Sequence, residues 1–262
     1  MKLISLTLEN FRQFEERQTI CFATDPMQNI TLISAGNGLG KSTICNAFLW
    51  CLFGSGFHFL DESHEGVAHL PSGFWKRARE GEHHNVIVEL EFEVKGVTVT
   101  MRRTCTAHVR AMCEVPHVTF SEQLNANFNF KWNSECALVA LQELRDQIPH
   151  EDCISEIVKS DSLRLATLAS LRRPSRGRKS RLPLFLDSPF GNMDRAASQC
   201  FAKEIPGLRH QVIVLTSPSA VPLDAMSGLS SRIGAKFEIR AGSSRESHAG
   251  ERPFRALICR PE

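Results

Sequence analysis

Tyrosine, paired cysteines and long apolar runs are all missing from this sequence of 262 residues. No apolar run reaches the roughly 18 residues that a membrane-spanning helix needs, which argues against a membrane protein. The nine cysteines include no C-x-x-C pair, and their odd number and irregular spacing argue against a zinc site or a disulfide framework. The first six residues read as a strand and lack a signal-peptide core. These absences predict a cytoplasmic protein with buried or incidental thiols.

The net charge is also close to zero, which argues against a protein that binds nucleic acid over its whole surface. Lys and Arg number 31 against 29 Asp and Glu, a formal net charge of +2, so any nucleic-acid contact must come from a local basic patch. Hydrophobic residues make up 42% and charged residues 23% of the chain, near the averages of globular proteins. This composition excludes wholesale disorder and a fibrous fold, and the length fits one large domain or two small ones.

Hydrophobic periodicity predicts strands around one helix at the start of the chain. In residues 3–8, Ile4, Leu6 and Leu8 share one face of a strand, and the opposite face with Leu3 is more polar. We expect further strands at residues 18–22 and 29–34, and a helix over residues 41–53.

The next stretch predicts an antiparallel unit. Apolar residues alternate with glutamates over residues 86–101, which is typical of a β-hairpin with one wet face, turning at Lys95–Gly96. We expect another strand of the same sheet near residues 128–132 and a helix over residues 137–147. We interpret the adjacent His83 and His84, which have no cysteine at ligand spacing, as a surface loop.

The second half of the chain has a different pattern. In chain order it predicts a helix at 162–171, a basic loop at 172–181, a strand at 182–186, a helix at 194–203, a buried strand at 211–216, an edge strand at 236–240 and a loose tail over 241–262.

The strongest motif is the glycine-rich segment between the strand at 29–34 and the helix that follows. It reads Ala-Gly-Asn-Gly-Leu-Gly-Lys-Ser-Thr over residues 35–43. Gly36, Gly38 and Gly40 let the backbone curl so that its N–H groups point at phosphate oxygens, and the helix dipole points at the same place. Lys41 would then reach the β- and γ-phosphates of a nucleotide, and Ser42 would bind Mg²⁺.

A second motif completes the first. The apolar run at 182–186 ends in Asp187, the Walker B arrangement, in which the carboxylate holds Mg²⁺ opposite Ser42. Aspartate often ends a strand before a turn, so this motif gains its meaning from the phosphate loop.

Three stretches resemble the ATPase heads of SMC-like DNA-repair ATPases, a branch of the ABC-type P-loop fold. They are Leu-Glu-Asn-Phe-Arg-Gln-Phe at 8–14, the loop at 35–43, and Leu-Asp-Ser-Pro-Phe-Gly-Asn-Met-Asp at 186–194. The resemblance covers about residues 1–55 and 160–220. Within that branch, the motifs most resemble the heads of repair-nuclease ATPase subunits and of the ATPase subunit of bacterial DNA sulfur-modification systems.

The resemblance implies an α/β fold: an ABC-type P-loop NTPase head with a mixed sheet, an antiparallel β subdomain and a C-terminal Walker B lobe. The N-terminal lobe would span residues 1–150 and the C-terminal lobe residues 155–240, with strands 30–34 and 182–186 adjacent in one sheet. ATP and Mg²⁺ would be the cofactors. Two heads would form a homodimer that reaches DNA through a partner nuclease or modification complex.

The same resemblance assigns roles to single residues. The nucleotide-binding set would comprise Arg12, Gly36, Asn37, Gly38, Gly40, Lys41, Ser42 and Thr43. Asp194 would lie at the dimer interface, although it also has the position of a helix N-cap, and Arg12 also fits an exposed surface arginine.

Four departures from the family pattern bear on catalysis. Ser188 stands where the family has the glutamate that acts as general base, and a hydroxyl is a far poorer base. The stretch Ser155–Lys159 has no glycine where a signature loop is expected, Ser217 stands in place of the switch histidine, and no heptad pattern of a coiled coil is present. We therefore count Lys41, Asp187 and Ser188 as the candidate catalytic set, with slow hydrolysis.

These departures leave two alternatives to a working ATPase. The chain is then a hydrolysis-deficient, nucleotide-gated binding module, or a truncated remnant of a longer coiled-coil ATPase. An ABC transporter ATPase is a weaker match because its signature and switch motifs are missing as well.

The run Arg172–Arg181 has six positive residues in ten. It is either a direct contact to the DNA backbone or a solvated loop, and the lack of interleaved aromatic residues favours the loop.

Overall fold

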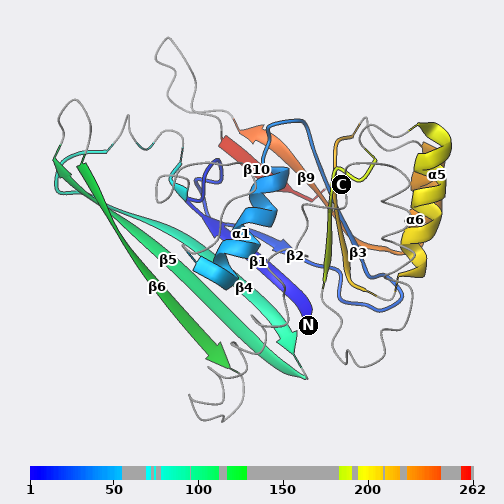
Figure 1. Cartoon of the computed structure of the whole chain (residues 1–262), viewed down its shortest axis with the longest axis horizontal. Helices are drawn as coiled ribbons and strands as arrows, with labels where there is room; N and C mark the ends of the chain where they lie inside the picture. The colour runs from blue at the N-terminus through cyan, green and yellow to red at the C-terminus, as the bar shows by residue number, and fades with distance from the viewer. Residues whose placement is uncertain are drawn as a thin grey trace.

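The computed structural model describes residues 1–54, 69–71, 74, 78–94, 96–111, 117–128, 183–190, 194–208, 210–218, 223–242 and 255–260. Several expectations lie outside these residues: the end of the strand at 128–132, the helices at 137–147 and 162–171, the stretch Ser155–Lys159 and the basic run Arg172–Arg181. The described part contains two five-stranded sheets with helix α1 between them (Figure 1).

The first sheet is antiparallel throughout, with the order β2-β1-β4-β5-β6. Its strands are β1 (Lys2–Glu9), β2 (Gln18–Cys21), β4 (His83–Val94), β5 (Val97–Ala111) and β6 (His117–Phe128). The expected hairpin is therefore confirmed, although its strands are longer than the alternation indicated, and β6 begins well before the strand expected at 128–132.

The second sheet is mixed, with the order β10-β9-β3-β8-β7. Its strands are β3 (Ile30–Ala35), β7 (Leu184–Asp187), β8 (Val212–Thr216), β9 (Ile233–Gly242) and β10 (Arg255–Cys259). The pairs β9–β3, β3–β8 and β8–β7 are parallel, and β10 pairs antiparallel with β9.

This strand order corrects three expectations. Strands β3 and β7 share a sheet but are not adjacent, because β8, an apolar run buried along its whole length, takes the central place between them. Strand β9 is an inner strand and not an edge strand. The segment beyond Ala241, which we expected to be loose throughout, contains β10, and β10 forms the edge.

Two smaller corrections concern β1 and β4. A β-bulge in β1 between Leu3 and Ser5 shifts the register against β4, so that Leu3 joins Leu6 and Leu8 in the core, while Ile4 is only half-buried. His83 and His84 lie within β4 and not in a loop, because β4 begins earlier than its apolar run.

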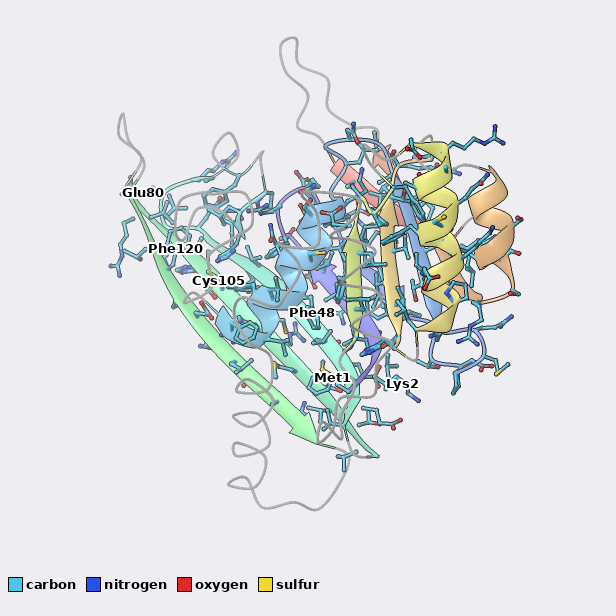
Figure 2. The ribbon with its side chains drawn as sticks, turned by 45° about the vertical axis from the view of Figure 1, so that its right-hand side comes forward. Met1, Lys2, Phe48, Glu80, Cys105 and Phe120 are labelled. Carbon is cyan, nitrogen blue, oxygen red and sulfur yellow. The ribbon has the colours of Figure 1, made fainter. Side chains whose placement is uncertain are left out.

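Helix α1 (Lys41–Phe53) has the bounds that the sequence predicted, and eleven of its 13 residues are buried. It is buried nearly all round because it lies between the two sheets. Phe48, which Figure 2 labels, packs on Phe185 of β7. The two ring centroids are 4.9 Å apart. The main core therefore joins the first sheet, α1 and one face of the second sheet.

The other face of the second sheet has its own core. Helices α5 (Arg195–Glu204) and α6 (Leu223–Ser230), with the short 3-10 helix Ile205–Gly207, cover this side (Figure 1). Phe190 and Phe201 pack edge to face there, 5.8 Å apart, beside Leu186 and Val214 of the sheet.

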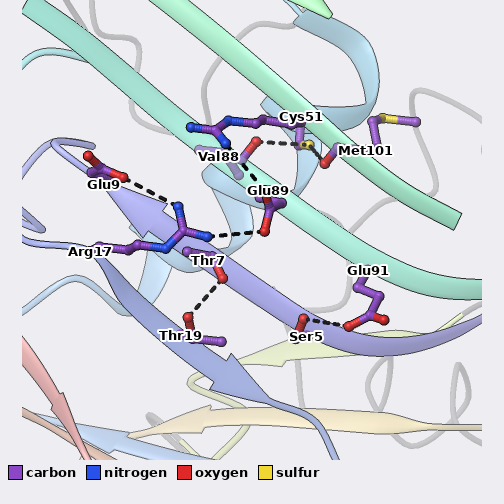
Figure 3. A network of polar contacts seen from close by, with 11 residues as sticks. Ser5, Thr7, Glu9, Arg17, Thr19, Cys51, Val88, Glu89, Glu91 and Met101 are labelled. Atoms are coloured by element: carbon purple, nitrogen blue, oxygen red, sulfur yellow. Dashed lines mark hydrogen bonds and ion pairs between the residues drawn. The ribbon is translucent and has the colours of Figure 1, made fainter. Parts of the chain in front are cut away.

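The outward face of the first sheet is polar, as the glutamate alternation predicted (Figure 3). Arg17 bridges Glu9 and Glu89 across the strands, at 3.5 and 3.2 Å. On the inner side, the Cys51 thiol faces the carbonyl oxygens of Val88 and Met101, each at 3.6 Å, and burial raises the pKa of Cys51 to about 12. This thiol is inert, as expected of a buried cysteine.

Candidate functional site

The glycine-rich loop joins the end of β3 to the start of α1. Asn37 and Gly38 lie exposed at its apex, and Gly40 is buried directly before the helix. Gly38 and Gly40 have φ of 76° and 110°, a region that side chains rarely adopt. A Cβ on Gly40 would also lie 2.6 Å from Gln13 Nε2 and 3.0 Å from Phe14 Cζ. The turn at Gly40 thus requires glycine for two reasons.

Lys41 folds back over this loop. Its Nζ donates to the carbonyl oxygens of Ala35 at 2.9 Å and Gly36 at 3.0 Å. Burial lowers the pKa of Lys41, and the nearby Asp187 carboxylate opposes that shift. The N-cap of α1 is a glycine without a side-chain hydrogen bond, so the first-turn N–H groups face this place with the positive end of the helix dipole. The arrangement suits a bound anion such as a phosphate.

A hydrogen bond between Ser42 and Asp187 connects the phosphate loop with the end of β7. Ser42, the second residue of α1, donates its hydroxyl to Asp187 Oδ2 at 2.7 Å, and Asp187 is the last residue of β7. Although β8 separates β3 from β7, both strands are parallel and end at the same edge of the sheet. The sequence therefore placed this pair correctly even though it put the strands side by side.

The donor set fits Mg²⁺. A hydroxyl and a carboxylate are hard oxygen ligands, and Mg²⁺ in nucleotide sites takes one or two such groups and fills the rest with water and phosphate oxygens. Among the described residues no group of three His, Cys, Asp or Glu side chains gathers around a point. A site of this kind would need the phosphates of a ligand to complete it.

Ser188 occupies a strained position next to Asp187. Its φ is 51°, unusual for a residue other than glycine, and its backbone N–H donates to Leu215 O at 2.7 Å. Its hydroxyl donates to Asp187 Oδ1 at 3.2 Å. Ser188 therefore holds the Asp187 carboxylate through a hydrogen bond, and its hydroxyl is a far weaker base than a carboxylate.

Gln13 belongs to this site, and our reading of the sequence missed it. Its Oε1 accepts from Thr43 Oγ1 at 3.1 Å, and its backbone oxygen accepts from Ala256 N of β10 at 2.8 Å. The turn between Phe11 and Phe14, closed by two backbone hydrogen bonds, presents it to the loop. Its place in the motif at 8–14, beside Arg12, was the only signal in the sequence.

Arg12 lies in the same turn, with a φ of 53°, and its N–H donates to His69 O at 2.9 Å. Burial lowers the pKa of His69 to about 4, and the charges of Arg12 and Arg103 add to this shift. A contact of Arg12 with a nucleotide stays a prediction.

Asp194 is the N-cap of α5. Its Oδ1 accepts from Ala197 N at 2.7 Å, which confirms the capping alternative. The residue is exposed, and its role at a dimer interface stays a prediction.

The opposite end of α1 is held by Arg103 of β5. Its side chain is 7% exposed, donates to Cys51 O at 3.1 Å and to Leu52 O at 3.5 Å, and pairs with Glu122 of β6. A cation at these last carbonyls complements the negative end of the helix dipole. The antiparallel sheet therefore fixes the helix whose first turn forms the site.

Comparison with known proteins identifies the relatives of this arrangement. The model of the AAA domain family matches residues 5–171. The SMC head domain from Thermotoga maritima matches with a TM-score of 0.56 and 17% identity, covering 100% of both chains. The SmcHead crystallised with the C-winged helix domain of ScpA matches with a TM-score of 0.56 and 14% identity, covering 99% of this chain and 98% of that one.

Identities this low show the fold alone, and that fold, the fold of an SMC head domain, agrees with the α/β head expected from the sequence. No curated protein matches the chain. Among the described helices, none is long and apolar enough to cross a membrane.

Proposed function

Because this chain belongs to the AAA domain family and has the fold of an SMC head, we propose that it binds ATP with Mg²⁺ and acts in DNA repair or DNA modification. The observation that most directly supports a site for ATP and Mg²⁺ is the 2.7 Å contact between Ser42 Oγ and Asp187 Oδ2. It joins the phosphate loop and the Walker B strand, two parts of the chain 145 residues apart.

Each residue has a task in the proposed site. The loop from Gly36 to Gly40 and the first turn of α1 bind the phosphates through backbone N–H groups. Lys41 neutralises the β- and γ-phosphates, and Ser42 with Asp187 holds Mg²⁺, which bridges phosphate oxygens and polarises them. Gln13 fixes the side of the loop through Thr43.

We further propose that nucleotide binding controls association of two heads and, through it, a DNA-bound partner nuclease or modification complex. This step rests on the resemblance to SMC-like heads, and one related head is crystallised with a domain of its partner ScpA. Asp194, exposed at the start of α5, would lie at the interface of such a dimer.

The test is ATP binding and steady-state hydrolysis by the purified chain, with and without Mg²⁺ and DNA, in wild type and Lys41→Ala. We expect Lys41→Ala to abolish ATP binding, because Lys41 carries the only positively charged side chain in residues 35–43. Lys203→Ala removes an exposed lysine from α5 and serves as the matched control. Undiminished ATP binding by Lys41→Ala would overturn the site assignment.

Ser188 favours a second candidate function, a nucleotide-gated binding module with little turnover. Its hydroxyl is bonded to Asp187 and replaces the carboxylate that would activate water. Ser188→Glu should raise turnover about 10²-fold or more if the missing base is the limitation, whereas Ser188→Ala should leave it low. Wild-type turnover well above background that disappears in Lys41→Ala would contradict the module.

A further inference from the structure

A pair of histidines lies outside the nucleotide site, on the polar outer face of the first sheet. His83 in β4 and His108 in β5 are directly opposite in the strand register. His83 is the first residue of β4, and on the other side of β5 His108 is opposite Thr119 of β6. Residues opposite one another on neighbouring antiparallel strands point to the same face, so both rings project from one surface.

The two rings approach through equivalent atoms. Nδ1 of His83 and Nδ1 of His108 are 2.7 Å apart, and the rings meet edge to face with centroids 4.6 Å apart. Two ring nitrogens reach this distance only when one donates a proton to the lone pair of the other. The two Nδ1 atoms therefore point at a common place, which a single proton fills.

Ser121 of β6 gives the other ring nitrogen of His108 a partner that can accept or donate a hydrogen bond. Its Oγ lies 3.1 Å from His108 Nε2. When Nε2–H donates to this hydroxyl, His108 is the tautomer with an unprotonated Nδ1, ready to accept from His83 or to bind a metal ion. Histidine ligands of metals commonly have their other ring N–H oriented by such a partner.

We propose that His83 and His108 form a surface site for a divalent transition-metal ion, bound through both Nδ1 atoms in place of the shared proton. Imidazole is a preferred ligand of Zn²⁺. Zn–N bonds of about 2.1 Å at a tetrahedral angle would separate the two nitrogens by about 3.4 Å, a small opening of two rings at the surface. Water completes the coordination, since the described residues supply no third His, Cys, Asp or Glu.

A metal ion bound by only two histidines has free coordination positions, and these determine what the site could do. A metal with two protein ligands is bound more weakly than one in a closed structural site and keeps positions for a ligand from another molecule. It would also tie β4 to β5 at the outer surface of the sheet. The proposal is independent of ATP binding, because none of its residues contacts the phosphate loop.

The experiment is a calorimetric Zn²⁺ titration of the full chain without nucleotide, in wild type, His83→Ala and His108→Ala. His84→Ala is the matched control, because His84 is next in sequence but its ring contacts Glu82 at 3.3 Å and Phe74 on the other side of the strand. All proteins retain the same cysteines, so differences between them report the histidines.

We expect one Zn²⁺ to bind wild type and His84→Ala alike, and binding to weaken at least tenfold in His83→Ala and His108→Ala. Ser121→Ala should weaken it by about tenfold, as loss of an orienting partner does elsewhere. His83→Gln and far-UV circular dichroism guard against loss of folding. Zn²⁺ affinity that is unchanged in either single variant, or that falls equally in His84→Ala, would overturn the proposal.

Discussion

Gly40 should be the least replaceable glycine of the loop, and Gly38 provides a matched comparison. Both have positive φ, so Gly→Ala at either position places a side chain in the left-handed region at about 1–2 kcal/mol. The added Cβ meets nothing within 4 Å at Gly38, but at Gly40 it would lie 3.0 Å from the Phe14 ring and 2.6 Å from the Gln13 amide. This overpacking should cost a further 1–3 kcal/mol at Gly40.

The measurement is urea unfolding followed by tryptophan fluorescence, to which Trp50, buried in α1, contributes together with Trp75 and Trp132. Alanine also restricts the unfolded chain, but equally in both variants, so the difference between them isolates the contact. Gly40→Ala should be the less stable protein and should lose ATP affinity, because the first turn of α1 must shift. Gly38→Ala should keep most of both. Equal loss of stability in the two variants would refute the reasoning.

Three further predictions concern residues around α1. Burial keeps His69 neutral and lowers its pKa from 6.5 to about 4. The stabilisation should therefore be complete above pH 6.5 and fall by up to about 3 kcal/mol as the pH drops toward 4, because the unfolded chain takes up the proton first. The variant His69→Leu, unfolded at both pH values, should lack this loss. Gln13→Ala should weaken ATP binding severalfold, while the free energy of unfolding without ligand falls by about 1 kcal/mol or less, because the change removes one hydrogen bond to Thr43. ATP titrations and urea unfolding of both proteins test this. A loss of binding free energy no larger than the loss of stability would show that Gln13 is only structural. Arg103→Met should lower the free energy of unfolding in urea by about 3–5 kcal/mol, because it leaves Glu122 unpaired. Adding Glu122→Gln should restore part of this loss. If the effects of the two changes simply add in the double variant, the pairing is contradicted.

Local chemistry was readable from the sequence because neighbouring residues determine it. The glycine and lysine spacing placed the loop, and the bounds of α1 followed to the residue. The contact of Ser42 with Asp187 was also predictable, since both motifs end at the carboxyl edge of parallel strands.

The strand order was not readable, because it depends on contacts between distant segments. A continuous apolar run such as β8 fits any buried place in a sheet, and only its packing against both β3 and β7 makes it central. The bulge in β1 breaks the alternation that assigned its faces. Gln13 escaped notice because a glutamine in a turn has no chemical signature until Thr43 is seen beside it.

The geometry of the Asp187 carboxylate bears on how this head would use ATP. Both of its oxygens accept from serines, Oδ2 from Ser42 and Oδ1 from Ser188. In the proposed site, the Ser42 hydroxyl and a carboxylate oxygen of Asp187 would hold Mg²⁺, and only the hydrogen bond between these two groups would have to open. The Ser188 bond can persist, and it keeps the neighbouring position occupied by a hydroxyl that cannot take a proton from water at neutral pH. In the proposed site, binding and hydrolysis would thus depend on different neighbours of the Asp187 carboxylate. We therefore expect substitutions at Ser42 to abolish Mg²⁺-dependent binding, and those at Ser188 to change turnover with little effect on affinity.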